Sequence, residues 1–152
     1  MVETIERRRL IVPALGQLYE ALAPFSYAIM RFATGAVLLP HGVQKVFYGS
    51  TARLADAIAA KGLPFPLLLA YLTLISEFAA AACVAVGLLT RIAAAMIFVQ
   101  MVVIVIYFQW SGGYFWTNRG YEFPLLWAAL CLAIVFRGGG RWSVDHYLGK
   151  EF

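Results

Sequence analysis

The chain has 152 residues, of which 62% are hydrophobic and only 13% are charged, and its mean hydropathy is +0.78. Soluble domains are about 45–50% apolar and about 25% charged, so this composition excludes an ordinary soluble domain and also a disordered chain. The net charge of +4 comes from basic residues that separate apolar runs, which is typical of a single integral membrane domain in contact with lipid and predicts no nucleic acid partner.

Residues 1–24 precede the first long apolar stretch and combine Arg7, Arg8 and Arg9 with leucines at helical spacing. We interpret this segment as a basic helix that lies in the membrane interface, with a mobile basic tail as the alternative. No small-residue cleavage pattern follows it, so we expect the first span to act as an uncleaved signal.

A membrane-spanning helix needs about 20 mostly apolar residues, and four later stretches approach this length. They are residues 25–47, 65–89, 92–110 and 123–136, and the last is short unless it extends over 121–137. The expected fold class is therefore an all-α membrane protein, with a four-transmembrane-helix bundle over residues 25–137 and a tail over 138–152.

The connections between these stretches predict how the spans are arranged. Residues 51–61 form a short amphipathic pattern that ends before Gly62, a common helix stop. The turn at 87–91 is so short that the second and third spans must be antiparallel neighbours. Aromatic residues in the loop at 111–120 suit the membrane interface, and the three glycines at 138–140 predict the end of the fourth helix.

Basic residues in short loops indicate the orientation in the membrane. The side that holds both termini carries more of them, namely Arg7, Arg8, Arg9, Arg91, Arg137, Arg141 and Lys150. The opposite side carries Arg53, Lys61 and Arg119, joined by Lys45 near the end of the first span. We therefore expect both termini to be cytoplasmic, in a multi-pass protein of the bacterial inner membrane.

A few ionisable residues lie inside or at the rim of the predicted spans, where charge is destabilising and usually faces the bundle interior. These residues form the candidate intramembrane polar site: Arg31, His41, Lys45, Glu77 and Glu122. The three on the first span share one helical face at about 100° per residue. From their depths, we expect Glu77 to pair with Arg31 or His41, and Glu122 to pair with Lys45 or Arg119.

Two interpretations of this polar site stay open. The charges are either interhelical pairs that hold the register of the bundle, or the lining of a pocket that binds a polar ring or carries protons. Gly35 and Gly42 lie near the same face of the first span and allow close approach of a helix or a ligand.

Several kinds of redox site find no support in the sequence. The second histidine, His146, lies in the tail, so a bis-histidine haem within the membrane is not predicted. Cys83 and Cys131 lie singly in apolar runs, which favours free thiols over a metal site or disulfide. We find no zinc spacing, nucleotide-binding loop or nucleophile elbow, and so predict no intrinsic cofactor and no metal.

Four short motifs occur in order between residues 31 and 145. They are Arg31 with Gly35 and His41-Gly42-x-x-Lys45, Glu77 followed by Gly-Leu-Leu-Thr-Arg at 87–91, Gly-Tyr-Glu-Phe-Pro at 120–124, and the segment 138–145, with Gly139 where a proline is expected. Together they resemble the DoxX-like family of small membrane proteins. The resemblance implies a four-helix bundle of the inner membrane.

The resemblance also implies a functional class. The family takes its name from a subunit of a thiosulfate:quinone oxidoreductase, and many members carry an oxidoreductase label. It implies an accessory or quinone-side subunit, with quinone as the ligand and the redox chemistry in a partner subunit. His41, Glu77 and Arg31 would then line the quinone site. The alternatives are a non-catalytic scaffold or binding protein, and a small proton-coupled transporter that works as a homo-oligomer.

Overall fold

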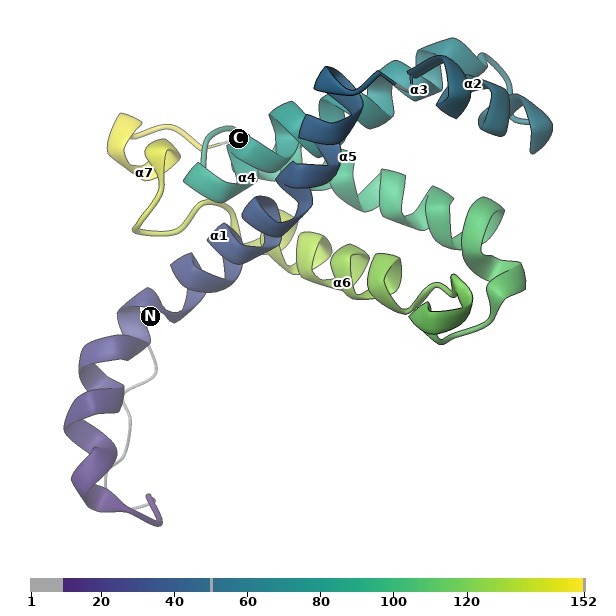
Figure 1. The fold of residues 1–152 in the computed structure, drawn as a ribbon. Coiled ribbons are helices and arrows are strands. Elements are labelled where there is room, and N and C mark those ends of the chain that lie inside the picture. The colour runs from purple at the N-terminus through teal and green to yellow at the C-terminus, as the bar shows by residue number, and fades with distance from the viewer. Residues whose placement is uncertain (1–9, 50, 152) are drawn as a thin grey trace.

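The structure, a computed structural model, describes residues 10–49 and 51–151. Every regular element in these ranges is a helix. The longest, α1 (Gly16–Phe47), follows a short 3₁₀ turn, η2 (Pro13–Leu15), and crosses over the other helices. Its N-terminal half projects away from them, as Figure 1 shows.

Helix α1 continues through Pro24 and Pro40 without a break. Together with η2 it forms a candidate membrane span of 35 residues, Pro13–Phe47. At about 1.5 Å per residue this helix is about 50 Å long, whereas the hydrocarbon core of a bilayer is about 30 Å thick. The predicted first span is therefore the C-terminal part of a longer helix. That residues 1–24 lie in the interface stays a prediction, and residues 1–9 are outside the described part of the chain.

The second and third predicted spans are confirmed as helices long and apolar enough to cross a membrane. The second, Pro66–Val86, consists of α3 (Pro66–Ile75), the π-helical segment η3 (Ser76–Ala80) and α4 (Ala81–Val86). The third, Thr90–Gly112, consists of α5 (Thr90–Val103), the π-helical segment η4 (Ile104–Gln109) and a 3₁₀ turn, η5 (Trp110–Gly112). The tight turn between them begins at Gly87, whose φ of +77° is a left-handed conformation that glycine adopts readily.

The fourth predicted span is a helix, but its length does not confirm it as a span. After another 3₁₀ turn, η6 (Trp116–Asn118), helix α6 (Glu122–Arg137) has 16 residues, or about 24 Å. It packs along α5 and ends at Gly138, which has a φ of +79°. The part of the chain that the structure describes therefore contains three candidate spans rather than four.

Two short helices lie at the ends of the bundle. The predicted amphipathic helix is present as α2 (Thr51–Ala60), and it packs against α3. Helix α7 (Val144–Leu148) lies near α4, and the Asp145 amide donates a 2.9 Å hydrogen bond to the Gly87 carbonyl. Helix α2 therefore packs at one end of the bundle, and helix α7 is attached at the other.

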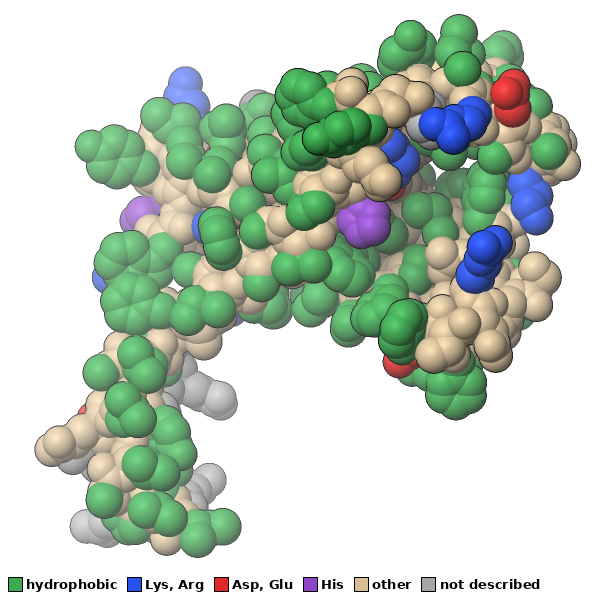
Figure 2. Space-filling model, in the orientation of Figure 1, with side chains coloured by type: hydrophobic (Ala, Val, Ile, Leu, Met, Phe, Trp, Pro, Cys, Tyr) green, Lys and Arg blue, Asp and Glu red, His purple; other side chains and the backbone are tan. Residues whose placement is uncertain are grey.

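Small side chains make up much of the core, where α1, α4, α5 and α6 meet. The fully buried members include Ala81, Val84, Ala94, Ile97, Cys131 and Ile134. The outside is apolar as well: hydrophobic side chains cover most of the face in Figure 2, and charged side chains lie mostly toward its two ends. A surface of this kind suits contact with lipid.

Candidate functional site

The helix contact that builds the site depends on two glycines of α1. A Cβ on Gly42 would stand 2.5 Å from the Glu77 carbonyl oxygen, and a Cβ on Gly35 would stand 2.5 Å from the Ala85 amide nitrogen. Both distances are too short for a real contact. The glycines therefore let α1 pack directly on the backbone of η3 and α4, which is the helix approach that their spacing predicted.

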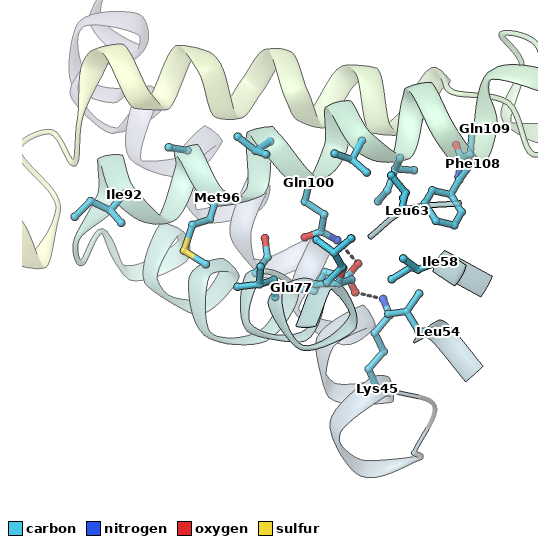
Figure 3. Close-up of a pocket in the computed structure, with 18 residues that line it drawn as sticks. Lys45, Leu54, Ile58, Leu63, Glu77, Ile92, Met96, Gln100, Phe108 and Gln109 are labelled. Atoms are coloured by element: carbon cyan, nitrogen blue, oxygen red, sulfur yellow. Dashed lines mark hydrogen bonds and ion pairs between the residues drawn. The ribbon is translucent and has the colours of Figure 1, made fainter. Parts of the chain in front are cut away.

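This close packing brings three polar side chains together in the middle of the bundle. The Lys45 ammonium forms an ion pair with Oε2 of Glu77, whose side chain is only 6% exposed. The Gln100 Nε2 amide donates a 2.6 Å hydrogen bond to Oε1 of the same carboxylate. Both Glu77 oxygens thus have a donor, one from α1 and one from α5, as Figure 3 shows.

The two π-helical segments both contribute to this site. Glu77 and Ser76 lie in η3, and Phe108 and Gln109 lie in η4. A π-helical turn interrupts the regular backbone hydrogen bonding of an α-helix, and such turns occur frequently at functional sites. Residues of both π-helical segments line the same cavity, which makes this cavity the candidate site.

A cavity of about 740 Å³ adjoins the polar side chains. It extends along α5 and η4 from Ile92 to Gln109, about 25 Å at about 1.5 Å per residue. Its other walls come from α3 and η3, from Lys45 of α1, and from Leu54 and Ile58 of α2. Most of the lining is apolar, and the polar groups come from α1, from the second span and from the third span. This combination is typical of sites for amphipathic small molecules.

The cavity opens toward the lipid-facing surface of the bundle. Leu72, Ile92 and Val99 line it, and yet they are 43%, 47% and 59% exposed. Side chains that face both the cavity and the outside mark a lateral opening between α3 and α5. A hydrophobic ligand is therefore able to enter from the bilayer without passing through water.

Three buried polar atoms at this cavity have no hydrogen-bond partner: Ser76 Oγ, Gln100 Oε1 and Gln109 Oε1. Buried polar atoms without a partner are uncommon in proteins, because each loses its hydrogen bonds to water without a replacement. All three belong to residues that line the same cavity, so the polar group of a bound molecule is able to supply the missing partners.

The predicted pairing of Glu77 with Arg31 or His41 is wrong, because Glu77 pairs with Lys45. Arg31 lies at the other end of the bundle, where it donates to the carbonyl oxygens of Val84 at 2.5 Å, Ala85 at 2.7 Å and Trp142 at 2.6 Å. Helix α4 ends at Val86, and its last carbonyls lack partners within the helix. A buried guanidinium supplies donors to them, so Arg31 is explained by packing of helix ends rather than by ligand binding.

A second polar cluster surrounds Arg31 and joins three of the four sequence motifs. We call Arg31, Thr90 and Asp145 the C-terminal polar cluster. Asp145 accepts hydrogen bonds from the amides of Leu89 at 2.7 Å and Thr90 at 2.9 Å, and from the Thr90 hydroxyl at 2.6 Å. The tail is thereby tied to the turn between the second and third spans.

These contacts set the acidity of Asp145. Burial raises the pKa of its carboxyl, but the hydrogen bonds from Thr90 and Leu89 and the positive charge of Arg31 outweigh burial and hold the pKa below its ordinary value. Asp145 therefore stays ionised, and it acts as a structural anion.

The other two predicted site residues lie apart from Lys45 and Glu77. His41 is exposed on α1, although it is only one turn from Lys45. Glu122, at the start of α6, accepts a 3.2 Å hydrogen bond from the Trp116 amide and pairs with neither Lys45 nor Arg119, contrary to the prediction. Of the five candidates, the structure brings together only Lys45 and Glu77.

Sequence reasoning missed the uncharged members of the site. Gln100, Ser76 and Gln109 are polar residues within apolar spans, so a signal for them was present. Only ionisable side chains were considered as candidates. Burial of an unpaired amide or hydroxyl is also unfavourable, although less so than burial of a charge, and it would have pointed to these three residues.

Comparison with known proteins places the chain in a family. The DoxX family model matches residues 26–110, which is more than half of the chain. The chain belongs to the DoxX family. It is also 28% identical over 149 residues to the "Uncharacterized membrane protein Rv3486" of Mycobacterium tuberculosis, with 91% of each chain covered. No solved structure matches the chain significantly.

The matched region contains the site. Residues 26–110 include Lys45, Glu77, Gln100 and Gln109 together with both π-helical segments. The family assignment and the three apolar helices agree with the expected location, so the chain is a multi-pass membrane protein.

Proposed function

We propose that this DoxX protein is the quinone-side accessory subunit of a membrane oxidoreductase system. The observation that carries the proposal is the cavity beside Lys45, Glu77 and Gln100. It is apolar along most of its length, open to lipid, and polar where a head group would lie. An isoprenoid quinone has the matching form, with a polar ring and a long apolar tail.

In this proposal the protein binds quinone and the electron-transferring centre belongs to a partner subunit. The Lys45–Glu77–Gln100 network holds charge and hydrogen bonds beside the ring. Because this network joins three helices, its side chains are held in a fixed geometry, as a binding site for a small polar head group requires. The proposed site lies at Lys45, Glu77 and Gln100, whereas the sequence placed it at His41, Glu77 and Arg31.

The proposal includes a fourth span and a fixed orientation. Helix α6 crosses the membrane beside α5 as the shorter member of a four-helix bundle, and local thinning of the bilayer accommodates its length. Both termini and the C-terminal polar cluster lie on the cytoplasmic side of the inner membrane. The cavity end at Gln109, the α2 helix and the aromatic loop then lie on the outer side.

Quinone binding is tested on the full chain purified in mild detergent with its native lipids. Solvent extraction followed by chromatography is expected to recover an isoprenoid quinone in near-stoichiometric amount. Ala95→Phe, which fills the cavity without touching the polar network, is expected to remove it. His41→Ala, on the exposed side of α1, is the matched control and is expected to retain it.

Absence of quinone from the unmodified protein, together with no binding of added quinone, contradicts the proposal. The partner is tested separately, by identifying what remains bound to the tagged protein in mild detergent. A stable complex with a subunit that carries a flavin, haem or thiol centre supports the accessory role. A protein that purifies only as a single chain or homo-oligomer contradicts that role.

A further inference from the structure

The unpartnered atoms at the cavity differ in what they are able to bind. A carboxamide oxygen only accepts hydrogen bonds, whereas a hydroxyl both donates and accepts. Gln100 Oε1 and Gln109 Oε1 are therefore acceptors that lack a donor, and Ser76 Oγ serves in either role. Two of the three unpartnered atoms at the cavity therefore only accept hydrogen bonds.

The orientation of the Gln100 amide is determined by its neighbour. Its Nε2 group donates to the Glu77 carboxylate at 2.6 Å, and the reverse orientation would place two oxygens against each other. Gln100 Oε1 consequently points away from Glu77, and no side chain in the described part of the chain donates to it.

Two donor groups of the site bind Glu77. The Lys45 ammonium and the Gln100 Nε2 amide each donate one hydrogen bond to its carboxylate. A ligand carbonyl at this position finds the Ser76 hydroxyl as a free donor, while the Gln100 oxygen stays without a partner. A ligand hydroxyl donates to the Gln100 oxygen, which a ligand carbonyl cannot do.

We infer that the cavity binds an amphipathic lipid through a hydroxyl head group that donates a hydrogen bond to Gln100, and that among quinones it prefers the reduced, hydroxyl-bearing quinol to the oxidised form. This inference rests on the proposed function for the quinone class, but the unpartnered acceptor oxygen of Gln100 is an independent observation. The apolar lining and the lateral opening between α3 and α5 receive the tail. Gln109, about 13 Å further along the helix, is too far to contact the same ring and offers a second acceptor toward the other end of the cavity.

The test compares three probes on the full chain in lipid nanodiscs without oxygen: decylubiquinol, decylubiquinone and the isoprenoid alcohol farnesol. Equilibrium binding of each is measured by calorimetry. One additional hydrogen bond to a buried acceptor predicts that decylubiquinol binds about fivefold to tenfold more tightly than decylubiquinone.

Substitutions test whether Gln100 and Ser76 cause the preference for the reduced form. Gln100→Met removes the acceptor and is expected to bring the affinities for the two quinone forms within about twofold, whereas Gln44→Met, on the exposed side of α1, keeps the preference. Because Gln100→Met also removes a partner of Glu77, Ser76→Ala serves as a milder second variant. It removes one oxygen atom and is expected to weaken decylubiquinol binding severalfold, while Ser26→Ala, outside the cavity, has no effect.

The outcomes separate this inference from the proposed function. Equal or tighter binding of decylubiquinone overturns the preference for a donor head group and leaves the quinone-linked function standing. Binding of farnesol with neither quinone form supports the hydroxyl ligand and overturns the quinone-linked function. Failure of all three probes to bind overturns both.

Discussion

Glu77 places a carboxylate in the middle of an apolar span, and the chain gives each of its oxygens a separate donor. Lys45 reaches it from α1 and Gln100 reaches it from α5. Removing charge from water is strongly unfavourable, and an ion pair offsets this only when its hydrogen bonds are complete. Both carboxylate oxygens of Glu77 have a donor, so we expect the stability of the folded protein to fall when any one of these three side chains is removed.

Glu77→Gln is expected to destabilise the folded protein, because it leaves the Lys45 ammonium without its counter-charge. Lys45 is 24% exposed and partly solvated, so we expect a loss of about 1–3 kcal/mol rather than the larger value of a fully buried pair. Thermal unfolding in detergent measures this. Glu122→Gln, at the start of α6, is the control and is expected to change the stability by less than about 1 kcal/mol. Equal effects of the two variants would contradict the network.

Asp145 predicts a dependence of stability on pH. Its pKa is lowered in the folded state, so its contribution is complete above the ordinary carboxyl pKa of about 4 and is lost as the pH falls through the folded value. Asp145→Asn turns an amide N–H toward the backbone donors of Thr90 and Leu89. We expect it to lower the stability by about 1–3 kcal/mol at pH 7.

The measurement for Asp145 is thermal unfolding of both proteins between pH 3 and pH 8. The difference between them is expected to narrow below about pH 4, where the unfolded carboxyl becomes protonated. Asp56→Asn, on the exposed α2 helix, is the matched control and is expected to show no such difference. If the stability difference between the unmodified protein and Asp145→Asn were the same at every pH, Asp145 would act through its shape rather than its charge.

At the scale of elements, the contact between α1 and the second span depends on backbone approaching backbone. Gly35 and Gly42 both face main-chain atoms that have no room to move aside. The contact positions Lys45 next to Glu77, so the geometry of the site depends on how closely these two helices pack.

Gly35→Ala is expected to lower the stability of the fold by about 2–3 kcal/mol, because its Cβ would meet the backbone of Ala81 and Ala85 and force the helices apart. Unfolding of the purified protein in a denaturing detergent measures the effect. Ala33→Leu adds more volume on the exposed side of the same helix, where it meets lipid, and is expected to be neutral. An unchanged stability for Gly35→Ala would mean that the helices are further apart than described.

At the scale of the whole molecule, the distribution of basic residues predicts the orientation of the protein in the membrane. Basic residues concentrate on the side of the chain termini, and the C-terminal polar cluster gathers at the same end of the bundle. Reporter fusions after Gly113 and at the C-terminus are expected to report an outer loop and a cytoplasmic end. This result requires that α6 cross the membrane. A loop and a C-terminus on the same side would show that α6 does not span, and a cytoplasmic loop would reverse the orientation.

Much of the fold was predictable because its signals are local. Apolar stretches of about 20 residues identified the helices of the second and third spans, and Gly87 and Gly138 marked where helices end. The length of the first helix was not predictable, since Pro24 resembles a boundary. In an apolar environment the helix gains more from continuing its own hydrogen bonds than it loses at one proline.

The amino-acid sequence by itself determined that this protein lies in a membrane, that it is helical, and that Glu77 and Lys45 are among five ionisable residues within or at the rim of its spans. The partners were decided by the tertiary structure. Helical periodicity gives the direction of a side chain about its own axis, but it does not give the rotation or depth of one helix against another. Packing at Gly42 set that depth, and so Lys45 rather than His41 met Glu77, while Gln100 completed the site from a third helix.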